Sequence, residues 1–245
     1  MLLFSRILNI KKSQARQMER RLERRYPPGR LFPLFATIDV AGEPRAAKVL
    51  DLSAHGAGLQ VSGPAYAAGL AAQLHLQLDE TWMEFPCRIA HVKVLPKGCR
   101  LGLTAQFKDF ATQKAYLQLL QPVALGSSMR PIAPEETRQD EPDMLKAVFT
   151  GLPGSELSVW RQGNHLGDLV SFVWQMDEYV IRGDSTVGVL QISPRRQLPR
   201  PSAAAPKKLP AAVHDEVRLL YNWTMFNLPK EVPGDIRSFL QGFVD

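Results

Sequence analysis

The chain of 245 residues has little cysteine, which bounds its chemistry and its compartment. Its two cysteines, Cys87 and Cys99, fall on the two arms of one predicted hairpin that turns near Lys97-Gly98. Such a turn leaves them too far apart for a disulfide, which needs Cα atoms within about 7 Å. We therefore expect two free thiols, as is usual in a reducing compartment, and a cytoplasmic protein.

Motifs of catalytic sites are also missing. The five histidines are scattered along the chain, and the sequence has no H-E-x-x-H pattern, no nucleophile elbow and no phosphate loop. Two cysteines without a matching histidine set do not make a zinc site. We therefore expect a protein that is not an enzyme and that needs no metal or cofactor.

Long apolar runs are absent, and the positive charge is unevenly spread. No run approaches the ~20 residues that cross a bilayer, and the first residues lack the order of a secretory signal. The net charge is +6, but residues 1–30 carry +7 and residues 194–212 carry +5, so the remainder is acidic. Basic segments without basic and aromatic residues interleaved on a strand make nucleic acid an improbable partner.

The most informative feature that is present is the stretch Asp51-Leu52-Ser53-Ala54-His55-Gly56-Ala57-Gly58-Leu59, which joins two apolar runs. Asp51 and Ser53 are two residues apart, so on a strand they share one face. Gly56 suits a tight reversal of the chain. The stretch is compatible with a simple well-made turn or with the edge of a ligand site.

A dense arginine cluster, residues 20–30, precedes this stretch across one predicted hairpin. An arginine pair before the first strand, followed by D-x-S-x-x-G-x-x-L after the second, resembles the signature of the PilZ-domain family of bacterial receptors for cyclic di-GMP. The resemblance covers roughly residues 20–125. It implies a six-stranded antiparallel barrel, a closing helix and a cyclic di-GMP ligand.

The residue types suit that ligand. Arginine can bind the O6/N7 edge of guanine bidentately and can stack on its face, while a carboxylate and a hydroxyl can accept its N1-H and N2-H groups. The family spacing R-x-x-x-R occurs upstream, at residues 20/24 and 21/25, and a Pro28-Gly29 insertion separates it from the first strand. The predicted ligand-binding residues are Arg21, Arg24, Arg25, Arg30, Asp51, Ser53 and Gly56. The alternative for the arginines is that they only solvate a basic helix.

Periodicity predicts a mainly β chain with two strand-rich parts. Six strands alternate between residues 31 and 107, and a helix follows at 111–121. Five further strands are expected at 145–150, 156–161, 168–176, 178–183 and 187–192, with Trp160, Phe172, Trp174 and Tyr179 as a small core. Two apolar helical stripes near the C-terminus must be buried on the barrels or on a partner.

These signals divide the chain into successive segments. An N-terminal helix (1–25), basic and amphipathic, would pack on the barrel or a partner helix, or lie on an anionic membrane. The rest comprises a PilZ-like β-barrel with its helix (26–125), an acidic linker (126–143), a small β domain (144–193), a proline-rich basic linker (194–212) and a C-terminal helical segment (213–245).

The sequence therefore predicts a bacterial, cytoplasmic, non-enzymatic cyclic di-GMP receptor. The resemblance implies that ligand draws the arginine linker against the barrel, reorients the N-terminal helix and so signals to an unknown protein of motility, pilus or exopolysaccharide machinery. The alternative is a degenerate PilZ-like adaptor that acts by protein contacts without nucleotide, which the shifted arginine spacing favours.

Overall fold

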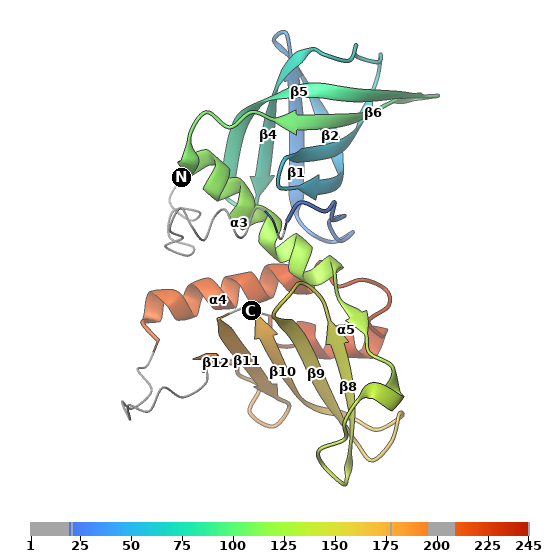
Figure 1. The fold of residues 1–245 in the computed structure, drawn as a ribbon, viewed down its shortest axis with the longest axis vertical. Helices are drawn as coiled ribbons and strands as arrows, with labels where there is room; N and C mark the ends of the chain where they lie inside the picture. The colour runs from blue at the N-terminus through green and yellow to red at the C-terminus, as the bar shows by residue number, and fades with distance from the viewer. Residues whose placement is uncertain (1–19, 21, 177, 196–208, 245) are drawn as a thin grey trace. The chain divides into compact units, whose positions relative to one another are not determined.

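The computed structural model describes residues 20, 22–176, 178–195 and 209–244. The chain divides into two compact units, Met1–Ala124 and Leu125–Asp245, each with its own sheet (Figure 1). Most of the predicted N-terminal helix (1–25) lies outside the described residues. Its last residues, Leu22 to Arg25, are not helical. The backbone groups of Leu22 and Tyr26 make hydrogen bonds to residues 52–54 instead of to a helical turn.

The first unit is a closed barrel of six antiparallel strands, as the sequence predicts (Figure 1). Around the barrel the order is β1-β2-β3-β6-β5-β4. Inward residues alternate with outward ones, which is the burial pattern of a sheet with one face in a core. The strands are β1 (Leu34–Val40), β2 (Glu43–Ser53), β3 (Gly56–Ser62), β4 (Ala71–Leu78), β5 (Thr81–Leu95) and β6 (Gly98–Ala105). Both cysteines are free and buried.

Helix α3 (Phe110–Ser127) follows the barrel and is longer than the predicted 111–121. Pro122 lies inside this helix, although it lacks the N–H of a helical hydrogen bond. The residues after it, Val123 to Ser127, are all buried. Burial of these side chains outweighs the lost hydrogen bond, so packing rather than local propensity sets the length of α3.

The second unit is a six-stranded antiparallel sheet with two helices packed on it. The last strand lies later than the predicted 187–192, because the N–H groups of Val187 and Gly188 bond to the Asp184 carbonyl and form a loop there. The sheet order is β12-β11-β10-β9-β8-β7. The elements are β7 (Arg130–Pro131), η1 (Pro134–Glu136), β8 (Met144–Thr150), β9 (Ser155–Gln162), β10 (Leu169–Met176), β11 (Tyr179–Asp184), β12 (Gln191–Pro194), α4 (Ala211–Met225) and α5 (Gly234–Gln241).

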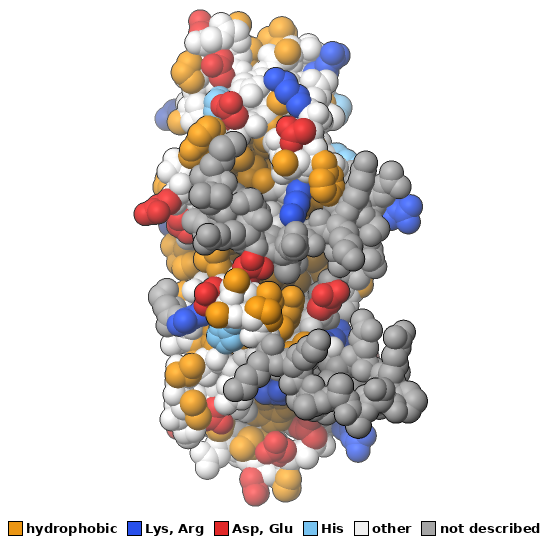
Figure 2. All heavy atoms as spheres, turned by 90° about the vertical axis from the view of Figure 1, so that its left-hand side faces the viewer, with side chains coloured by type: hydrophobic (Ala, Val, Ile, Leu, Met, Phe, Trp, Pro, Cys, Tyr) orange, Lys and Arg blue, Asp and Glu red, His pale blue; other side chains and the backbone are white. Residues whose placement is uncertain are grey.

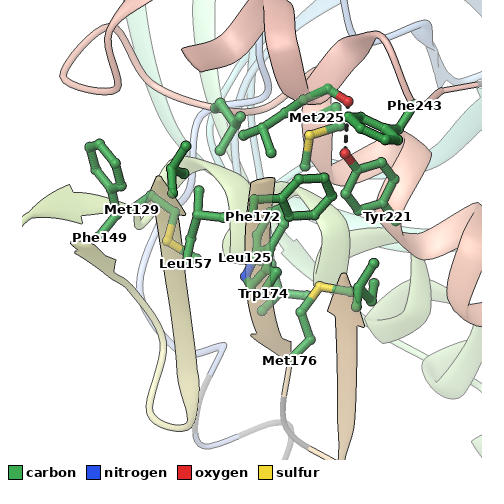
Figure 3. Close-up of a cluster of buried hydrophobic side chains, with 14 of the residues drawn as sticks. Leu125, Met129, Phe149, Leu157, Phe172, Trp174, Met176, Tyr221, Met225 and Phe243 are labelled. Carbon is green, nitrogen blue, oxygen red and sulfur yellow. Dashed lines mark hydrogen bonds between the residues drawn. The ribbon is translucent and has the colours of Figure 1, made fainter. Parts of the chain in front are cut away.

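The C-terminal helices share one core with this sheet (Figure 3). The ring of Tyr221 on α4 stacks on that of Phe172, with centroids 5.8 Å apart, and its hydroxyl donates to the Leu240 carbonyl on α5. Phe172 and Trp174 are core residues as predicted. Trp160 is not: its indole N–H donates to Asp140, and the Lys146 ammonium lies over its ring.

The segment predicted as an acidic linker is thus partly ordered on the sheet. Arg130–Pro131 pairs with β8, and Gln139 exchanges two hydrogen bonds with the backbone of Lys146. No helix in the described ranges is long and apolar enough to span a membrane. On the face shown in Figure 2, hydrophobic side chains are mixed with charged ones of both signs, which is the ordinary composition of a folded protein's surface.

Candidate functional site

Residues 22–26, which we call the arginine segment, lie along the end of β2 and are joined to it by an isolated β-bridge. Tyr26 and Leu52 exchange two backbone hydrogen bonds of 2.8 and 2.9 Å, and the Ala54 N–H donates to the Leu22 carbonyl at 2.7 Å. The side chains of Leu22 and Tyr26 anchor the segment, because both are buried. Arg24 and Arg25 are therefore held beside the Asp51–Gly56 stretch, although they are far from it in sequence.

Arg25 and Asp51 form the ion pair that joins the two motifs. The Arg25 Nη1 to Asp51 Oδ1 distance is 2.7 Å, and both side chains keep access to solvent, at 55% and 29% exposure. Partly exposed pairs of this kind contribute only about 0–1 kcal/mol. A carboxylate has about four acceptor positions, so Asp51 can keep Arg25 and still accept two donors from a ligand.

A β-bulge aims Asp51 away from the core. The register between β2 and β3 shifts between Val49 and Asp51, which leaves Leu50 as an extra residue. Val49 is buried before the bulge and Leu52 after it, so Asp51 and Ser53 fall on the outward face. The partner of Asp51 is Gly58, where a Cβ would lie 2.7 Å from the Asp51 carboxylate. The missing side chain at Gly58 leaves room for that carboxylate.

The turn between β2 and β3 is held from behind by Tyr116 of α3. Its hydroxyl lies 3.0 Å from the Ser53 carbonyl and 2.8 Å from that of Gly56. Burial raises the pKa of Tyr116 well above its usual value, so the hydroxyl stays protonated and donates. No other residue fits at position 56, because a Cβ on Gly56 would lie 1.9 Å from the Leu103 carbonyl oxygen.

The predicted site residues are therefore only partly brought together. Arg25, Asp51, Ser53 and Gly56 meet, but the Ser53 hydroxyl is buried and donates to the Gly56 carbonyl at 3.4 Å. Arg24 is exposed on the same segment. Arg30 is exposed beyond Tyr26 and shows no contact with Asp51 among the described residues. Arg21 lies outside the described residues.

Sequence reasoning missed the residues that support the site. Gly58 was visible as a second glycine two residues after Gly56, inside a strand where glycine is unfavourable. The positions of Leu22 and Tyr26 as anchors, and of Tyr116 behind the turn, had no comparable signal in the sequence. Within the described ranges, no group of three or more His, Cys, Asp or Glu residues could hold a metal ion.

Parts of this chain are similar to known proteins. The model of the PilZ domain family matches residues 19–121, and no match is found among curated proteins. Similar solved structures include the PilZ domain of YcgR from Escherichia coli with c-di-GMP (16% identity, 41% of this chain and 88% of that chain, TM-score 0.36). Others are the PilZ domain of CeSA from a cellulose-synthesizing bacterium (18%, 39% and 93%, TM-score 0.33) and PlzA of Borreliella burgdorferi in complex with c-di-GMP (10%, 70% and 86%, TM-score 0.33). The family match and the closed barrel identify residues 19–121 of this chain as a PilZ domain.

Proposed function

We propose that this protein is a non-enzymatic receptor for cyclic di-GMP. The ligand binds where the segment Leu22–Tyr26 meets the stretch Asp51–Gly58. The observation that carries the proposal is the pairing of Tyr26 with Leu52, which sets Arg25 against Asp51. An arginine and a carboxylate side by side on an exposed sheet face offer groups of opposite sign to a ligand that has both guanine edges and phosphates.

The two edges of a guanine match these groups. Asp51 accepts the N1-H and N2-H donors, and an arginine fork takes the O6/N7 edge or stacks on the ring. Arg25 is placed for this role, with Arg24 beside it; Arg21 and Arg30 are further arginines of the proposed site. Ser53 and Gly56 shape the turn, and the Ser53 hydroxyl can accept a donor while it donates to Gly56.

Signal output is proposed to run through the arginine segment. It is held by two backbone hydrogen bonds to β2 and one to the turn that follows, by two buried side chains and by a weak ion pair, so its docked and undocked states differ by a modest free energy. A ligand that binds Arg25 and Asp51 together favours the docked state. The residues before Leu22 are then reoriented, and a partner of motility, pilus or exopolysaccharide machinery in a bacterial cytoplasm senses the change.

Titration of the full chain with cyclic di-GMP by calorimetry tests the receptor function. We expect binding, and an increase in the free energy of unfolding of about 2.7 kcal/mol at a hundredfold excess over Kd. Asp51→Asn keeps the shape of the side chain but loses its charge, and should weaken binding by about 1.5–3 kcal/mol. Asp168→Asn makes the same change at an exposed position of the second unit and should bind like the wild type.

One result would argue for the adaptor instead, and another for a ligand site elsewhere on the chain. One is the absence of heat and of a melting shift with the wild-type chain at about a hundredfold excess of ligand over a micromolar Kd. The other is equal affinity of the Asp51→Asn and wild-type chains, which would move the ligand away from this site.

A further inference from the structure

The sheet face that carries Asp51 extends over three more strands. The register takes Asp51 to Gly58 on β3, Gly102 on β6 and His91 on β5, all on the outer face of the barrel. Strands lie about 4.8 Å apart, so this row is about 14 Å long. A second bulge, between Ile89 and His91, turns His91 outward at the far end of the row.

The flanking rows on this face are cationic. Lys48 on β2 is in register through Gln60 with Arg100 on β6, and Arg100 pairs with Lys93 on β5. On the other side of the Asp51 row, Arg88 pairs with Thr104. We call Lys48, Arg88, Lys93 and Arg100 the basic face. In the part of the chain that the structure describes, all four are exposed and none forms an ion pair. Asp51 is the one acidic residue in these three rows.

Gly102 lies in the middle of this face, and its backbone conformation does not require a glycine. Its backbone is not in the left-handed region, and a Cβ would meet only His91, at an ordinary contact distance of 3.5 Å. Glycine inside a strand is destabilising, and it often marks a place where a ligand approaches the backbone closely. Gly102 therefore provides a flat surface between the cations.

We propose that the basic face binds the phosphates of the cyclic di-GMP molecule whose guanine is held by Arg25 and Asp51. The ring of the ligand lies over Gly102. Arg100, the next outward residue on β6, donates to one phosphate with Lys93 beside it, and Arg88, on the other side of the Asp51 row, faces the second phosphate. This inference rests on the proposed function. It extends the site from the arginine segment and the turn to two strands, β5 and β6, that carry none of the predicted ligand-binding residues.

Two substitutions on β6 test the extension. Arg100→Gln removes a charge-assisted hydrogen bond, so we expect Kd to rise about tenfold or more and its salt dependence to become weaker. Arg182→Gln, at an exposed arginine of the second unit, makes the same change in charge and should leave Kd unaltered. Gly102→Ala should keep or raise the melting temperature and yet weaken binding several-fold, because the methyl group holds the ligand off the backbone. If Gly102 had only a structural role, the melting temperature and the affinity of Gly102→Ala would not change in opposite directions.

The outcomes separate the two proposals. If the wild-type chain shows no binding, the receptor function itself fails. If the wild-type chain binds and both Arg100→Gln and Gly102→Ala bind equally well, the receptor function stands and the basic face is not part of the site. Equal losses of affinity in Arg100→Gln and Arg182→Gln would show a general effect of charge. They would also overturn the extension of the site to the basic face.

Discussion

The Tyr116 hydroxyl supports the turn between β2 and β3 from the core side. Its one hydrogen is shared between the carbonyls at both ends of the Ser53–Gly56 turn, and its ring lies in an aromatic cluster with Phe85 and Phe107. The ring is part of the barrel core, whereas the hydroxyl acts only on the turn. The two contributions can therefore be separated by removing one oxygen atom.

Tyr116→Phe should weaken cyclic di-GMP binding several-fold, because the turn loses its donor and samples other conformations. The free energy of unfolding should fall by about 1–3 kcal/mol, since two buried carbonyls lose a partner. Tyr221→Phe is the matched control: its hydroxyl is also buried and bonded to a carbonyl, but in the second unit. It should lower the stability of that unit and leave Kd unchanged. Titration and thermal unfolding of both variants check this, and equal Kd values for the Tyr116→Phe and wild-type chains would contradict it.

Single residues of the site could be predicted from the sequence where a residue type is unusual within an apolar strand. Asp51 and Gly56 stand out because a carboxylate and a glycine interrupt apolar strands. The outward direction of Asp51 was not predictable, because it depends on a bulge at Leu50 that shifts the alternation by one residue. Arg25 was singled out among several arginines, but its contact with Asp51 arises from backbone pairing that no spacing rule expresses.

At the scale of elements, the docked segment Leu22–Tyr26 is the part of the site most open to change. Leu22→Ala should shift this segment toward its undocked state, because the leucine side chain is almost wholly buried. Apparent affinity falls in proportion to the docked fraction, so Kd should rise while the melting temperature of the barrel hardly changes. Leu74→Ala, in the barrel core, should instead lower the melting temperature. Titration and thermal unfolding of both variants distinguish the two effects; an unchanged Kd in Leu22→Ala would exclude a role for docking.

Elements were predicted well where periodicity is strong and poorly where tertiary contacts decide. The six strands of the barrel follow from alternation and turn residues, and the structure has all six. The helix predicted to end before Pro122 continues to Ser127 because its later residues are buried. The predicted strand at 187–192 lies at Gln191–Pro194, because a loop closes on the Asp184 carbonyl.

At the scale of the whole molecule, each compact unit completes its own core. The second unit joins the predicted small β domain to the C-terminal helices, because α4 and α5 cover apolar side chains of its sheet. Nothing in the periodicity of the sequence indicated which surface those helices would bury. The proposed ligand site, including the basic face, lies entirely within the first unit, so we expect the second unit to influence affinity little.

Hydrogen exchange of the full chain with and without cyclic di-GMP tests the central claim most directly, because it locates the ligand without altering a residue. We expect increased protection in residues 22–26 and 51–58 together, with a further increase in 98–104 if the basic face takes part. The amides of the second unit should exchange as before. Protection that appears only outside the first unit, or none at saturating ligand, would contradict binding of cyclic di-GMP at the proposed site.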